Sequence, residues 1–95
     1  MRLFENNLVE EELELLEDVK VDENKEIILY NDEVNTFDFV IESLIKVCSH
    51  SPIQAEQCTF IVHYNGKCGV KKGDMAKLKP MCSALLDRGL TAEIV

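Results

Sequence analysis

Residues 37–48 read FDFVIESLIKVC and give the clearest secondary-structure signal in the chain. The apolar side chains of this stretch recur at intervals of three and four residues, which places them on one face of an α-helix over three turns. Asn35 and Thr36 precede the stretch and offer an N-cap for the helix. The apolar face is expected to consist of Phe37, Val40, Ile41, Leu44, Ile45 and Cys48.

The residues on either side predict a strand and a second helix. Residues 25–30, KEIILY, are rich in β-branched and aromatic side chains and indicate a strand, which stops at the polar turn 31–33. Ser51 is suited to cap a helix that begins at Pro52, and Gly66 is suited to end it in a left-handed conformation. We expect the apolar side of this helix to carry Ile53, Phe60, Ile61 and Tyr64.

The C-terminal third predicts a short strand at 67–71, a helix from Gly73-Asp74 to Arg88-Gly89, and a strand at 90–95. Pro80 falls inside this last helix and is expected to bend it, because proline cannot donate to the carbonyl of the preceding turn. The order β-α-α-β-α-β predicts an α/β (α+β) two-layer sandwich with a three-stranded antiparallel sheet packed on three helices. The apolar positions expected in the last helix are Met75, Leu78, Cys82, Leu85 and Leu86.

Length and charge bound the organisation of the chain. Ninety-five residues support one domain at most. The net charge is −8, but residues 1–26 hold ten acidic and three basic residues, whereas residues 27–95 hold eight and seven. We therefore expect a flexible acidic extension at 1–24, or a segment that docks as a transient amphipathic helix, and a core domain at 25–95.

The composition also excludes several classes of protein. An acidic chain without a basic stripe is a poor nucleic-acid binder, and no run of about 18 apolar residues could span a membrane. The first residues contain no apolar segment typical of a secretory signal, so the cytoplasm is the expected compartment. The four cysteines show no CxxC spacing and are expected to be reduced thiols, mostly buried, with no metal bound: Cys48, Cys58, Cys68 and Cys82.

Residues typical of catalysis are not suitably placed for it. No P-loop, GxGxxG, GxSxG or HExxH pattern occurs. Cys58 and His63 lie about 140° apart around one predicted helix and would not meet. We therefore predict that the protein is not an enzyme and requires no cofactor.

A polar turn and a histidine suggest a binding site instead. Asn31 and Glu33 lie in the turn after the first strand, and His63 lies near the end of the second predicted helix. If the adjacent helices pack together, an amide oxygen, a carboxylate and a neutral imidazole could converge. Three acceptors suit a cation with three hydrogens, such as a free α-ammonium. A structural histidine and an ordinary turn remain the alternatives.

Four stretches of the chain, taken in order, resemble the ClpS family, the adaptors of the bacterial N-end rule. They are LYNDE at 29–33, TFDFVI at 36–41, VHYNGK at 62–67 and CGV at 68–70. The resemblance covers residues 26–95 and implies the same β-α-α-β-α-β fold. It also implies a function: such proteins bind substrates whose first residue is Leu, Phe, Tyr or Trp and deliver them to the ClpA unfoldase of the ClpAP protease.

The resemblance implies roles for particular residues. The α-amino group of the substrate would be held by Asn31, Glu33 and His63, with Asp32 beside them. Asp74 and Lys79 would contact the N-terminal domain of ClpA, although a solvated helix face would explain them equally well. The acidic residues 1–24 resemble the extension that engages the unfoldase. The pocket for the first side chain would be lined by Leu29, Tyr30, Asn35, Phe37, Val40, Thr59, Val62 and Leu90.

The chain departs from the family pattern at several positions. Glu33 stands where the family has Asp, and both Phe37 and Thr59 stand where it usually has Met. A larger Phe37 narrows the pocket and a smaller Thr59 opens it. We expect an altered ranking of Leu, Phe, Tyr and Trp, with Ile or Val admitted. Two residues are missing between 67 and 68, and Pro80 has no family counterpart.

A second class of protein has the same element order. The C-terminal domain of the bacterial ribosomal stalk protein is a protein-interaction domain of this architecture. That alternative gives no reason for Asn31, Glu33 and His63 to converge beside an apolar hole. In both cases a monomer without nucleic-acid or membrane partners is expected.

Overall fold

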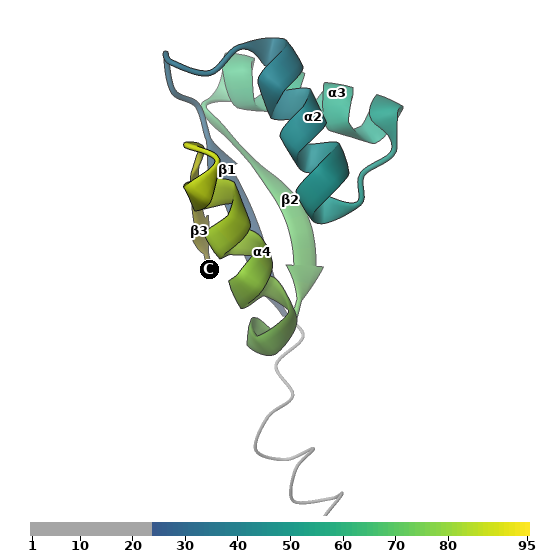
Figure 1. The fold of residues 1–95 in the computed structure, drawn as a ribbon, viewed down its shortest axis with the longest axis vertical. Helices are drawn as coiled ribbons and strands as arrows, with labels where there is room; N and C mark the ends of the chain where they lie inside the picture. The colour runs from purple at the N-terminus through teal and green to yellow at the C-terminus, as the bar shows by residue number, and fades with distance from the viewer. Residues whose placement is uncertain (1–23) are drawn as a thin grey trace, which may run out of the picture.

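The structure is a computed structural model that describes residues 24–95. The expected acidic extension therefore lies outside the described residues, apart from Asn24. Figure 1 shows the elements in the predicted order, which confirms the fold class. They are β1 (Lys25–Tyr30), α2 (Phe37–Cys48), α3 (Pro52–Asn65), β2 (Lys67–Gly73), α4 (Met75–Asp87) and β3 (Thr91–Ile94).

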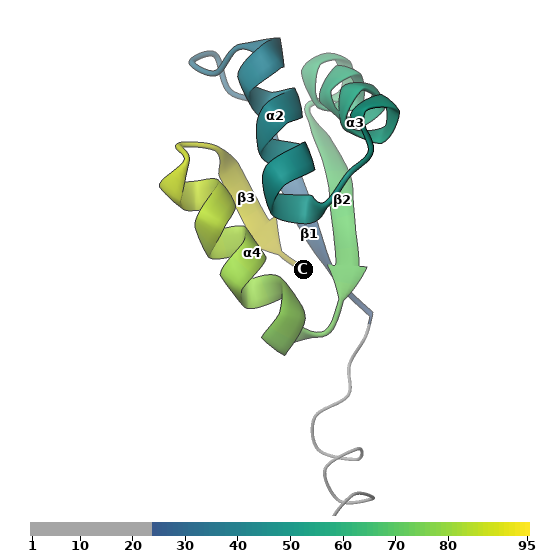
Figure 2. The same ribbon diagram turned by 45° about the vertical axis from the view of Figure 1, so that its right-hand side comes forward.

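The three strands form one antiparallel sheet in the order β2-β1-β3, and the three helices cover the same face of it (Figures 1 and 2). Ile27 and Leu29 on the central strand are almost fully buried, because alternate side chains of a strand point to the same face. Each such buried side chain contributes about 1.5–3 kcal/mol. The other large, fully buried apolar side chains are Leu44, Leu78 and Leu85.

The helix ends follow the capping residues in the sequence. The Thr36 hydroxyl accepts a hydrogen bond from the Phe39 backbone N–H (3.1 Å), and the Ser51 hydroxyl accepts one from Gln54 (3.1 Å). Gly66 ends α3 with φ at 94°, a conformation that a side chain disfavours. The predicted starts of α2 and α3 and the end of α3 are therefore confirmed. The strand β2 extends two residues beyond its predicted end, to Gly73.

The prediction for the buried side of α3 was wrong. Ile53, Phe60, Ile61 and Tyr64 are exposed, with 68%, 43%, 41% and 73% of their surfaces accessible. These positions lie on the opposite side of the helix from the face that meets the sheet. Apolar residues occur on both sides of α3, so their spacing alone does not identify the inner one. The residues that α3 buries are smaller: Ala55, Thr59 and Val62.

The helix α4 matches its prediction in part. Its central apolar residues, Leu78, Cys82 and Leu85, are buried, but Met75 and Leu86 are about half exposed. Pro80 lies inside the helix, which continues to Asp87.

The four cysteines are free thiols in this fold. Cys48 and Cys82 are buried, whereas Cys58 and Cys68 are half-buried. Burial raises the pKa of the Cys48 thiol to about 11, which keeps it protonated near neutral pH.

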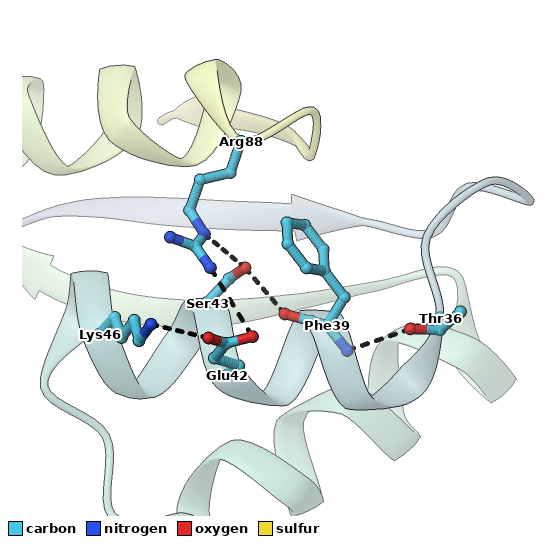
Figure 3. A network of polar contacts seen from close by, with 6 residues as sticks. All are labelled: Thr36, Phe39, Glu42, Ser43, Lys46 and Arg88. Carbon is cyan, nitrogen blue, oxygen red and sulfur yellow. Dashed lines mark hydrogen bonds and ion pairs between the residues drawn. The ribbon is translucent and has the colours of Figure 1, made fainter.

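Arg88 connects the end of α4 to α2 (Figure 3). Its Nε donates a hydrogen bond to the Ser43 hydroxyl (2.8 Å), and that hydroxyl donates in turn to the Phe39 carbonyl (2.8 Å). The guanidinium also lies 5.0 Å above the centre of the Phe39 ring. These contacts fix the turn that follows α4, and with it the position of Leu90.

Candidate functional site

A cavity of about 420 Å³ opens at the end of the sheet where β1 stops. Its walls come from the end of β1, the loop 31–36, the start of α2, the end of α3 and the residue before β3. Every residue that the sequence analysis assigned to amine binding or to the apolar pocket lines this one cavity. The full lining is Leu29, Tyr30, Asn31, Asp32, Glu33, Asn35, Thr36, Phe37, Val40, Thr59, Val62, His63 and Leu90.

Hydrogen bonds within the loop 31–36 hold it in shape. The Asp32 Oδ1 accepts from the backbone N–H groups of Val34 and Asn35, both at 2.8 Å, and its Oδ2 accepts from the Asn35 side-chain amide at 2.9 Å. Burial raises the pKa of this carboxyl, but the hydrogen bonds from Asn35 and Val34 outweigh it and hold the pKa below its usual value. The Asp32 carboxylate is therefore already used within the loop.

The Asn35 amide also joins the loop to the other side of the cavity. Its Nδ2 donates a second hydrogen bond to the Gly89 carbonyl (3.0 Å), in the turn before Leu90. At the opposite end of the loop, the Asn31 backbone N–H donates to the Gly66 carbonyl (2.9 Å) and fixes the end of α3. These bridging bonds could not be predicted from local sequence, because they join residues that are distant along the chain.

Three polar side chains at the cavity remain available to a ligand. Within residues 24–95, the side chains of Asn31, Glu33 and His63 take part in no hydrogen bond or ion pair, and all three are exposed. Tyr30 differs from them, because its hydroxyl donates to the Glu93 carboxylate, an interaction that raises the pKa of Tyr30. All three available groups can accept hydrogen bonds, which suits a ligand that donates hydrogen bonds.

The inner end of the cavity is apolar. Leu29, Val62 and Leu90 are no more than 5% exposed, and Thr59 is 3% exposed. The Thr59 hydroxyl donates to the Ala55 carbonyl one turn earlier (2.8 Å), so it needs no partner from a ligand. Such a chamber suits an uncharged, largely apolar side chain.

Aromatic rings form the rim on the side of α2 and α3. The Phe37 ring meets the His63 ring edge to face at 5.0 Å and the Phe60 ring at 5.2 Å. His63 in turn lies 4.8 Å from the Tyr64 ring. This arrangement was not predicted, because the sequence placed Phe60 and Tyr64 on the apolar side of the helix without indicating contacts to Phe37 or His63.

The residues expected to contact an unfoldase lie far from the cavity. In the sheet register Lys25 pairs with Gly73, whereas the cavity lies at the Tyr30 end of the same strand. Asp74 caps α4, and its carboxylate accepts from the Lys77 backbone N–H (2.8 Å). It also lines a second hollow of about 370 Å³, together with Lys72, Gly73 and Lys77. Lys79 is exposed one turn further along α4.

Comparison with known proteins decides the family. The family model described as "ATP-dependent Clp protease adaptor protein ClpS" matches residues 20–93. The chain belongs to the ClpS family. The adapter protein ClpS of Campylobacter jejuni (strain 81-176) is 38% identical over 68 residues, which cover 67% of this chain and 71% of that protein. ClpS of Sodalis glossinidius is 35% identical over 80 residues, or 82% of this chain and 74% of that protein.

A solved ClpS structure confirms the fold. Agrobacterium tumefaciens ClpS2 bound to L-phenylalaninamide superposes with a TM-score of 0.71, covering 75% of this chain and 93% of that one, at 18% identity. The resemblance to ClpS stated from the sequence is therefore confirmed, and the ribosomal-stalk alternative is not favoured.

Two other features concern only the described part of the chain. None of its helices has the length and apolarity needed to cross a membrane. Nor do residues 24–95 bring three His, Cys, Asp or Glu side chains together in a way that could hold a metal ion.

Proposed function

We propose that this ClpS-family protein binds the first residue of substrate proteins that begin with Leu, Phe, Tyr or Trp. It would then deliver these substrates to the ClpA unfoldase for degradation by ClpAP, acting as a monomer in the cytoplasm without catalysing a reaction itself. The observation that carries the proposal is the cavity of about 420 Å³, which has an apolar inner end and three available polar side chains at its mouth.

The polar groups suit a free α-ammonium. Asn31, Glu33 and His63 offer an amide oxygen, a carboxylate oxygen and an imidazole nitrogen that make no other hydrogen bond within the described residues. An ammonium donates three hydrogen bonds and carries one positive charge, so it matches this set. Charged hydrogen bonds of this type contribute about 1.5–3 kcal/mol each. We assign Asp32 to holding the loop rather than to direct contact.

The apolar end suits the side chain that follows the amine. Burying a Leu or Phe side chain contributes about 1.5–3 kcal/mol. Together with the charged hydrogen bonds, and after the cost of association, this supports an affinity of about 1 μM or better. Thr59 leaves the inner end wide, so we also propose that Ile or Val can enter.

The separation of the two candidate surfaces supports delivery. Asp74 and Lys79 lie toward the opposite end of the sheet from the cavity, so an unfoldase bound there would leave the mouth of the cavity open. We propose that these two residues contact ClpA and that the acidic residues 1–24 take part in delivery.

The decisive experiment is fluorescence anisotropy with a labelled peptide that begins with Phe. We expect tight binding that is lost when the amino terminus is acetylated and that falls at least tenfold in His63→Ala. Gln57→Ala, an exposed change on the same helix, is the matched control and should bind normally. Equal binding of free and acetylated peptides would contradict the proposal.

A panel of peptides that differ only at residue one tests the specificity. We expect Ile and Val to bind measurably to this chain and to lose affinity in Thr59→Met, which restores the residue usual in the family. A ranking that excludes Ile in both proteins would show that Thr59 does not widen the specificity.

A further inference from the structure

Two large aromatic side chains stand beside the cavity without lining it. Phe60 and Tyr64 lie one turn apart on the outer side of α3, with 43% and 73% of their surfaces exposed. Their rings stack at 6.1 Å with an interplanar angle of 6°. We call this pair the aromatic ledge. Two exposed aromatic rings next to a cavity form an apolar surface of a kind that often marks a binding site.

The aromatic ledge is continuous with the mouth of the cavity. Phe60 contacts Phe37 at 5.2 Å and Tyr64 contacts His63 at 4.8 Å, and both of these partners line the cavity. Phe37 and His63 also contact each other at 5.0 Å, so each of the four rings contacts two of the others. The ring centroids of the exposed pair therefore lie about 5 Å from those of the pair that lines the cavity.

The geometry of an extended peptide relates this distance to a residue of the substrate. Successive side chains of an extended chain point to opposite sides, so residues one and three share a side and residue two points the other way. Residues one and three lie about 6.6 Å apart at a rise of about 3.3 Å per residue. When residue one fills the cavity, residue three reaches the surface roughly one ring beyond the rim.

We propose that the aromatic ledge binds the side chain of the third residue of the substrate and favours an apolar or aromatic residue there. This inference rests on the proposed function, because it takes residue one to occupy the cavity. Phe60 and Tyr64 are then specificity residues, and the second residue of the substrate makes little difference to affinity.

The experiment uses two matched series of peptides that begin with Phe and are titrated against the full chain. One series carries Ala, Leu or Trp at residue three with Ala at residue two, and the other series reverses the two positions. We expect Trp at residue three to bind about 3–10-fold more tightly than Ala, the range typical of one aromatic contact. The same change at residue two should alter the affinity less than twofold.

Three variants assign the effect to the aromatic ledge. The gain from Trp at residue three should disappear in Tyr64→Ala and in Phe60→Ala. The gain should persist in Ile53→Ala, which removes another exposed apolar side chain of α3 that is not one of these four rings. Phe60→Ala can also loosen Phe37, and that would weaken the binding of all peptides equally. A double-mutant cycle, which combines the change in the protein with the change at residue three of the peptide, isolates the contact with residue three.

The outcomes separate the inference from the proposed function. Binding that ignores residue three, that responds to residue two instead, or that keeps its preference in both ledge variants overturns the inference alone. Failure of every Phe peptide to bind the unmodified chain overturns the proposed function and the inference with it.

Discussion

Helices α2 and α3 bury opposite kinds of side chain. The helix α2 turns its large apolar residues inward, and Leu44 is fully buried. The helix α3 turns the small Ala55 inward and leaves Ile53 and Phe60 exposed. The buried side of α3 supplies Ala55 to the core and Thr59 to the wall of the cavity, whereas α2 supplies Leu44 to the core. On α3, therefore, the size of an apolar residue does not reveal its burial.

Removal of a large side chain from the buried face of α2 is expected to have the largest effect. Leu44→Ala should lower the free energy of unfolding by about 2–5 kcal/mol, because it leaves a cavity among well-packed residues. Ile53→Ala, a similar truncation on the exposed side of α3, should cost no more than about 0.5 kcal/mol. Urea unfolding of both variants measures the difference, and equal costs would contradict the comparison.

Enlargement of a small residue on the inner side of α3 should have the next largest effect. Ala55 is fully buried, so Ala55→Leu is expected to destabilise the fold by about 1–3 kcal/mol through overpacking. Gln57→Leu places the same leucine at an exposed position of the same helix and should be close to neutral. Thermal or urea unfolding distinguishes them. If Ala55→Leu is also neutral, the inner side of α3 is not closely packed.

The same enlargement one turn later should affect binding more than stability. Thr59→Leu extends a residue that lines the cavity, so the added volume has free space to occupy. We expect a cost in stability below about 1 kcal/mol, since no overpacking results. Peptides that begin with Trp or Phe should bind about tenfold more weakly, which corresponds to about 1.4 kcal/mol. Anisotropy titration measures the affinity.

Thr59→Val is the control for that prediction, because it removes the hydroxyl without enlarging the side chain. It should leave the affinity for Trp and Phe peptides within about twofold, or roughly 0.4 kcal/mol. A tenfold loss in Thr59→Val would mean that the hydroxyl, rather than the space beside it, determines the affinity.

The smallest effect concerns the loop that faces α3 across the cavity, and it depends on pH. The folded-state pKa of Asp32 is lowered, so its hydrogen bonds stabilise the protein above the unfolded-state pKa, near 3.8. This contribution is lost as the pH falls through the lower folded-state value. Unfolding of Asp32→Asn should therefore show a shallower loss of stability below about pH 5 than the unmodified chain. If the two proteins lose stability equally below about pH 5, the loop does not depend on the ionised carboxylate of Asp32.

Much of the fold could be predicted from local signals. The helix α2 combines a clear apolar face with Thr36 as its cap, and Gly66 marks the end of α3, so these boundaries could be placed correctly. The inner side of α3 could not, because Phe60 and Val62 are both apolar and only the position of the sheet determines which one is buried. The length of β2 depends on pairing with β1, which also lies outside local sequence information.

The site shows the same division. The resemblance to ClpS indicated the residues that line the cavity, but not how they are held. The Asn35 amide donates to Asp32 within the loop and also to Gly89, 54 residues away, and the second of these bonds leaves no periodic signal in the sequence. The rings of Phe37 and Phe60 likewise meet only because two helices pack together.

The internally bonded loop 31–36 has a consequence for the thermodynamics of binding. Its hydrogen bonds from Val34 and Asn35 to Asp32, and from Asn35 to Gly89, are already made without a ligand. Ordering a loop on binding would subtract from the affinity, and a loop that is already ordered avoids that loss of entropy. The heat of binding should therefore come from contacts with the ligand itself, with little contribution from folding of the site.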